Sequence, residues 1–128
     1  MSFLSGLRGM MGSRPGLSEN WIIPEQSSDL DELFESGTHV IYKHSYNCAV
    51  CIFSKTRVEE VLEEQLNNAK FYFLDVVRKR ALSREVATRS GIHHESPQVV
   101  VLKNGRVAWH ASHSAIRKDE LRDAINSV

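Results

Sequence analysis

The chain has 128 residues, with 16 basic and 16 acidic side chains that leave no net charge at pH 7. This length fits one domain, and the balanced charge lacks the basic excess by which nucleic-acid-binding proteins hold phosphates. Hydrophobic residues make up 41% of the chain, but no stretch approaches the roughly 18 apolar residues of a membrane-spanning helix. We therefore expect a globular protein with neither nucleic acid nor a membrane as its partner.

The first 18 residues predict a flexible arm ahead of a single domain that spans residues 19–128. The arm is rich in glycine and serine, and Arg8 and Arg14 interrupt its apolar residues. A secretory signal requires an unbroken apolar segment of about 7–15 residues, which this stretch lacks. We expect the protein to stay in the cytoplasm, where thiols are kept reduced.

The first half of the domain alternates strands with helices. Four elements are expected there: strands over residues 20–23 and 38–42, a short helix around residues 30–34 and a long helix over residues 48–66. Ser27 or Ser28 is expected to cap the short helix, and Gly37 ends it. From Cys48 onward the apolar residues, Ile52 among them, recur at helical spacing, which indicates the long helix.

The second half continues this alternation and adds a hairpin. Its expected elements are strands over residues 70–77, 98–102 and 107–111, a helix around residues 82–87 and a closing helix over residues 114–125. Gly91 is expected to end the first of these helices and Ser114 to cap the second. The pair Asn104-Gly105 is typical of a tight hairpin turn. The order β-α-β-α-β-α-β-β-α predicts an α/β fold with a mixed central sheet flanked by helices.

The chain contains two cysteines, Cys48 and Cys51, at the point where a strand gives way to the long helix. Two cysteines this close in a reducing compartment are more typical of redox chemistry than of a structural disulfide. Free N–H groups and the dipole at a helix start stabilise a thiolate, so we assign Cys48 as the attacking nucleophile. Cys51 lies one helical turn further on and can resolve a mixed disulfide on Cys48.

The dipeptide Ser96-Pro97 precedes a central strand, where proline is unusual because it lacks an N–H donor. We expect this peptide bond to be cis and to face the cysteines, where it shapes the groove for a partner disulfide. Ser96, Asn47 and His44 are the expected substrate contacts. A charged His44 close to Cys48 would increase the thiolate fraction, and an exposed position at the end of a strand is the equally favoured alternative.

Over residues 20–126 the chain resembles thioredoxin in the order of its features. These are a strand, the Cys-x-x-Cys motif, a long helix, the X-Pro dipeptide, a hairpin with Lys-Asn-Gly and a final helix. The strings KHSYNC and HESPQVVVLKNGRVAWHASH are more specific. They are similar to the YtxJ family, the monothiol bacilliredoxin-like general stress proteins of bacteria. The resemblance implies a thioredoxin-like fold and the removal of bacillithiol, or a similar low-molecular-weight thiol, from oxidised client proteins. It places Cys48 as the attacking cysteine and Pro97 as the cis proline, with the small thiol as co-substrate and no other cofactor.

Two departures from these families affect the expected mechanism. The YtxJ-type motif is usually Cys-Pro-Ile-Ser, whereas Ala49, Val50 and Cys51 follow Cys48 here. A dithiol route through Cys51 therefore stands open beside the monothiol route. Thioredoxins also keep a buried carboxylate six residues before the first cysteine, where this chain has Tyr42. We expect a poorer general reductant than thioredoxin.

Two other functions fit the sequence less well. The first is a thioredoxin-fold binding module whose cysteines take no part in chemistry. The second is a structural zinc site that combines both cysteines with two of the histidines His44, His93, His94, His110 and His113. The spacing of these residues does not match that of a zinc finger.

Overall fold

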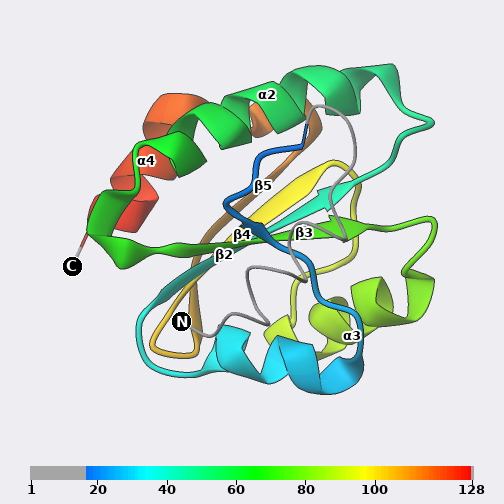
Figure 1. The fold of residues 1–128 in the computed structure, drawn as a ribbon, viewed down its shortest axis with the longest axis horizontal. Helices are drawn as coiled ribbons and strands as arrows, with labels where there is room; N and C mark the ends of the chain where they lie inside the picture. The colour runs from blue at the N-terminus through cyan, green and yellow to red at the C-terminus, as the bar shows by residue number, and fades with distance from the viewer. Residues whose placement is uncertain (1–16, 128) are drawn as a thin grey trace.

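The computed structural model describes residues 17–127, which form a sheet with helices on both of its faces (Figure 1). The described strands are β1 (Trp21–Ile22), β2 (Thr38–His44), β3 (Lys70–Asp75), β4 (Gln98–Lys103) and β5 (Arg106–Ser112). They lie in the order β1-β3-β2-β4-β5. β3 pairs parallel with both β1 and β2, whereas β4 pairs antiparallel with β2 and β5. The predicted mixed sheet is confirmed.

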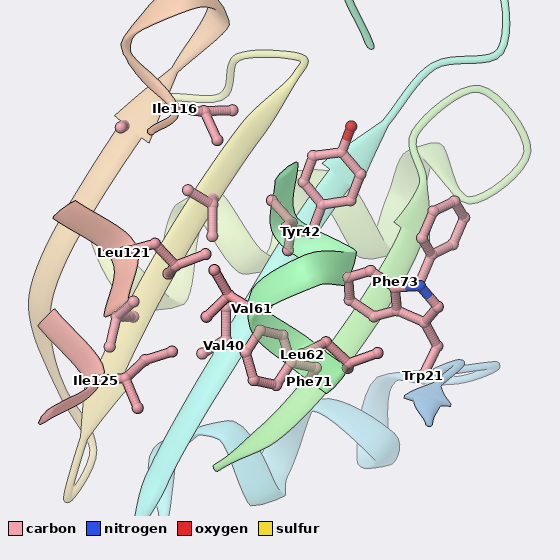
Figure 2. Packing of buried hydrophobic residues seen from close by; sticks show 14 residues of the cluster. Trp21, Val40, Tyr42, Val61, Leu62, Phe71, Phe73, Ile116, Leu121 and Ile125 are labelled. Atoms are coloured by element: carbon pink, nitrogen blue, oxygen red, sulfur yellow. The ribbon is translucent and has the colours of Figure 1, made fainter. Parts of the chain in front are cut away.

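Helices cover the two faces of this sheet in pairs. One face carries α2 (Ala49–Glu63) and α4 (Lys118–Asn126), and the other carries the 3-10 helix η1 (Ser27–Phe34) and α3 (Arg80–Ser90) (Figure 1). Two short 3-10 turns, η2 (Leu66–Asn68) and η3 (His113–Ala115), complete the described elements. The core beneath α2 and α4 is rich in aromatic side chains, among them Trp21, Tyr42, Phe71 and Phe73 (Figure 2). The core on the other face is mostly aliphatic.

β2 is the central strand and is buried on both faces, as parallel strands in layered α/β folds are. Successive side chains of a strand point to opposite faces, so Tyr42 joins the core beneath α2 while Ile41 joins the core beneath α3. Lys43 is also fully buried and follows the alternation to the α3 side. The last residue of β2, His44, leads directly into the turn before Cys48.

Two of the predicted helices require correction. The first is a 3-10 helix, and Gln26 occupies its N-cap position instead of a serine. The last begins at Lys118, so Ser114 is not its cap. His113 adopts a left-handed φ of 55°, and the buried Ile116 separates η3 from α4. Burial of this isoleucine draws the chain into the core before the helix can start.

Strand β3 ends two residues before the predicted limit of residue 77. The Asp75 carboxylate accepts hydrogen bonds from the backbone N–H groups of Val77 and Arg78, each at 3.1 Å. An aspartate that bonds to the backbone two or three residues later stabilises a turn, which ends the strand.

The hairpin between β4 and β5 is as predicted and touches η1. Gly105 has a φ of 81°, and a Cβ atom at this position would lie 2.5 Å from the carbonyl oxygen of Phe34. The side-chain oxygen of Asn104 accepts a hydrogen bond from the N–H of Gly37 at 2.8 Å. The positive φ and the close Phe34 carbonyl thus require glycine at position 105, and the Asn104 side chain joins the turn to Gly37.

Most of the predicted N-terminal arm lies outside the described residues, but Leu17 and Ser18 are part of the fold. Leu17 packs against the core beneath α2. The Ser18 N–H donates to Glu59 at 3.2 Å, and its hydroxyl donates to Glu63. These two residues, which were assigned to the arm, therefore contact the domain. Within residues 17–127, no helix combines the length and apolarity needed to cross a bilayer.

Candidate redox site

Cys48 occupies the N-cap position of α2, with extended backbone angles of φ −122° and ψ 119°. Its thiol is partly exposed and free of any disulfide. The turn before it is closed by the hydrogen bond from the Cys48 N–H to the Ser45 carbonyl at 3.3 Å. The end of β2 and this short turn therefore present the sulfur at the amino end of a 15-residue helix. This placement is the one predicted from the sequence.

The surroundings of Cys48 favour its thiolate. The pKa of the thiol is lowered, first by a hydrogen bond from the side chain of Cys51 and then by the backbone N–H groups of Cys51 and Val50. Hydrogen bonds that stabilise the charged form lower a pKa, and the thiolate is the reactive form of cysteine. The Cys48 sulfur is thus both accessible to a partner disulfide and activated as a nucleophile.

Cys51 has the opposite properties. Its side chain is completely buried, and burial is the largest cause of the raised pKa of its thiol. The proximity of Cys48 raises the pKa of Cys51 further, whereas the Ser45 backbone and the Ser96 hydroxyl lower it. A thiol that holds its proton more tightly than usual therefore lies one helical turn behind a thiol that loses its proton more readily.

The peptide bond between Ser96 and Pro97 is cis, as predicted. Pro97 is buried, and its carbonyl accepts a hydrogen bond from the N–H of His113 at 2.9 Å. The Ser96 hydroxyl oxygen is buried and has no hydrogen-bond partner in the described part of the chain. It is close enough to Cys51 to lower the pKa of that thiol, so its hydroxyl can donate to a Cys51 thiolate.

His44 is not placed as predicted. Its side chain is 1% exposed, so it cannot contact a substrate directly. Burial, followed by the charge of Lys55, lowers its pKa to about 4, so His44 is neutral near pH 7 and supplies no positive charge to Cys48. Both alternatives considered for this residue, a charged histidine and an exposed one, are wrong.

Tyr42 lies beneath Cys51 at the position where thioredoxins carry a carboxylate. Its hydroxyl donates to the Cys51 carbonyl at 3.1 Å and lies 2.9 Å from Nδ1 of His44. Burial raises the pKa of Tyr42 above its usual range, and the proximity of Cys51 and then Cys48 adds to this. The tyrosine is therefore a neutral hydrogen-bonding group below the thiols.

Several exposed apolar side chains were not predicted. They are Tyr46 on the turn before Cys48, Val50, Ile52 and Phe53 on α2, and Val77 after β3, and they are between 46% and 65% exposed. Ile52 had been expected to belong to the buried stripe of α2, and at 63% exposure that expectation is wrong. Residues 50–53 are all apolar or cysteine, and four consecutive residues point to all sides of a helix. Periodicity alone therefore could not identify which of these side chains face the solvent. Asn47 lies exposed on the same turn.

The described residues do not support the zinc alternative. Between residues 17 and 127, no group of three or more histidine, cysteine or acidic side chains is arranged to hold a metal ion. His94 instead bonds with Lys43 and Ser83, and His113 pairs with Glu95 at 3.3 Å. These two candidate ligands therefore contact other side chains instead of the cysteines.

Comparison with known proteins agrees with this geometry. Residues 23–121 match the family described as Monothiol bacilliredoxin BrxC. A solved protein with a thioredoxin fold is 25% identical, with a TM-score of 0.74 over 82% of this chain and 93% of that one. Thioredoxins from Malassezia sympodialis and Halobacterium salinarum NRC-1 show the same fold at 19% and 20% identity, with TM-scores of 0.63 and 0.61. Each comparison covers 80% of this chain and 85% of the thioredoxin.

Proposed function

Because the chain belongs to the monothiol bacilliredoxin family, whose members share a thiol redox role, we propose that it removes a low-molecular-weight thiol such as bacillithiol from protein cysteines. Its clients would be S-thiolated proteins in the cytoplasm. The observation that carries the proposal is the contrast between an accessible Cys48 with a lowered pKa and a buried, protonated Cys51.

The first step is an exchange at the client's mixed disulfide. The Cys48 thiolate attacks the sulfur of the small thiol, the bond between that sulfur and the client breaks, and the client leaves as a thiolate that takes a proton from water. The small thiol is then joined to Cys48 by a new disulfide. The cis Ser96-Pro97 segment and Asn47 are the proposed substrate contacts, since they lie beside the thiols and on the adjoining turn.

Two routes can release the bound thiol. In the dithiol route, Cys51 loses its proton and attacks the Cys48 sulfur, which forms the Cys48–Cys51 disulfide and frees the small thiol. In the monothiol route, a second small thiol attacks the one bound to Cys48, which yields a symmetrical small-molecule disulfide and restores the Cys48 thiolate. We favour the dithiol route here because the Cys51 side chain already hydrogen-bonds to the Cys48 sulfur.

The test uses a peptide carrying bacillithiol on one cysteine and the same peptide carrying glutathione. We expect the wild-type protein to release the free peptide, and Cys48→Ser to release none. Cys51→Ser is the matched control, because it should still accept the small thiol but retain it as a mixed disulfide visible by mass spectrometry.

Three results would contradict the proposal or its details. Release of the peptide by Cys48→Ser would remove Cys48 from its assigned role. Slow, equal alkylation of both cysteines near neutral pH, with no peptide release, would favour a binding module. Full turnover by Cys51→Ser with added small thiol would favour the monothiol route.

A further inference from the structure

Lys43 is a buried lysine that the redox chemistry described so far does not use. It is 0% exposed, and its Nζ atom lies 3.0 Å from Nδ1 of His94. Burial lowers the pKa of its ammonium group to about 8. No carboxylate in residues 17–127 forms an ion pair with it, and a buried ammonium without a counter-charge is unfavourable for folding. Fold stability therefore does not account for a lysine at this position.

The partner of Lys43 lies in the connection between α3 and β4, residues 91–97. Nδ1 of His94 is also 3.1 Å from the hydroxyl oxygen of Ser83 on α3. One imidazole nitrogen thus joins strand β2, helix α3 and the connection. A second buried side chain, Gln98, lies opposite Lys43 in the sheet and donates to the carbonyl of His93 at 2.8 Å. Two neighbouring buried groups therefore fix consecutive residues of this connection.

The other end of the connection reaches the cysteines. Ser96 follows His94 by two residues, and its buried hydroxyl lies beside Cys51 and favours the thiolate of that residue. Since the connection is short, the placement of His94 limits where the Ser96 hydroxyl can lie. Lys43 itself is on the sheet face opposite Tyr42, so its influence on the thiols must pass through the backbone of residues 94–96.

We propose that Lys43 and His94 are positioning residues for the second step of thiol exchange, because they hold the connection that carries Ser96 to Cys51. This inference rests on the proposed function and on its dithiol route. In that step the bond between Cys51 and Cys48 forms as the bond from Cys48 to the small thiol breaks. The proton lost by Cys51 ends on the released small thiol, and a correctly placed Ser96 hydroxyl stabilises the Cys51 thiolate before attack.

The first test compares Lys43→Met with the wild type. Methionine fills a similar volume but cannot donate to His94. We expect the mixed disulfide on Cys48 to form at a rate within about twofold of wild type, while its resolution by Cys51 slows about tenfold or more, as small displacements of reacting groups do. Lys70→Met is the matched control, since Lys70 belongs to the same sheet but is exposed and pairs with Glu32. Wild-type resolution in Lys43→Met would overturn the inference.

The second test separates positioning from general disruption. In His94→Asn the amide oxygen can replace Nδ1 as the acceptor for Lys43, whereas His94→Ala offers no acceptor. We expect the asparagine variant to keep most of the resolution rate and the alanine variant to lose it. Equal loss in both variants would contradict the inference, and this pair decides it if Lys43→Met fails to fold.

A measurement independent of turnover distinguishes this inference from the proposed function. Backbone amides of residues 92–96 should exchange hydrogen faster in Lys43→Met than in wild type, with α2 unchanged. Unchanged protection of residues 92–96 would overturn the positioning role even if dethiolation works. If the wild-type protein releases no small thiol, the proposed function fails, and the role of Lys43 in thiol exchange fails with it. Faster hydrogen exchange in Lys43→Met would then still show that Lys43 holds residues 92–96 in place.

Discussion

Cys48 and Cys51 are three residues apart, yet their surroundings shift their pKa values in opposite directions. The difference follows from position on α2. Cys48 precedes the first helical turn and faces free N–H groups, whereas Cys51 lies within that turn and is covered by the sheet. Sequence spacing predicts this division, since a cysteine at a helix start and another one turn later have these two environments in a βα unit.

At the same scale, Tyr42 shows how a neutral side chain replaces a carboxylate. Tyr42→Phe removes a hydroxyl that donates to the Cys51 carbonyl and lies within hydrogen-bond distance of His44 Nδ1. Both of these buried polar groups then lose a hydrogen-bond partner. We expect a loss of about 1–3 kcal/mol in the free energy of unfolding, measured by urea denaturation. Tyr46→Phe is the control, because Tyr46 is 46% exposed, and we expect it to cost less than about 0.5 kcal/mol. Equal costs would show that the buried hydroxyl contributes nothing.

At the scale of the elements, the turn between β4 and β5 requires glycine at position 105. Either the backbone conformation or a contact with a neighbouring element could be the reason. Gly105 and Gly91 have similar φ values of 81° and 77°, but only a Cβ atom at Gly105 would meet a neighbour, the Phe34 carbonyl oxygen at 2.5 Å. We expect Gly91→Ala to cost about 1 kcal/mol and Gly105→Ala to cost about 2 kcal/mol more, because backbone must move. Thermal unfolding of both variants measures this, and similar costs would rule out the Phe34 contact as a constraint.

The elements that the sequence predicts well are those with local causes. Asn104-Gly105 identifies its turn, and Gly91 ends α3 in the left-handed conformation that glycine favours. The features that it misses depend on distant residues. Lys43 resembles an ordinary polar residue at a strand end, and its side-chain partner, His94, lies 51 positions later. The start of α4 likewise depends on burial of Ile116 in the shared core, which no local pattern around Ser114 indicates.

For the whole molecule, the buried His44 links stability to pH. Its folded pKa of about 4 lies below the roughly 6.5 of an unfolded histidine, so between these values the unfolded chain binds a proton that the folded chain does not. Stability is therefore fully present above about pH 6.5 and is lost as the pH falls toward 4, by about 3 kcal/mol for this group.

Replacement of His44 should reduce this pH dependence. We expect His44→Gln, which stays neutral, to lose clearly less unfolding free energy than wild type between pH 7 and pH 4 in urea titrations. His110→Gln is the control, because His110 is exposed, and its pH dependence should match that of wild type. An unchanged pH dependence in His44→Gln would show that another group governs acid sensitivity.

The hydrogen bond between the two cysteines also affects how the protein withstands peroxide. A partly exposed cysteine with a lowered pKa, such as Cys48, is readily oxidised to a sulfenic acid, and further oxidation to the sulfinic form is irreversible for most proteins. With Cys51 one turn away, the sulfenic acid can condense with the second thiol and release water before more oxidant arrives. The resulting disulfide can be reduced again, so a serine at position 51 would leave the nucleophile open to permanent damage.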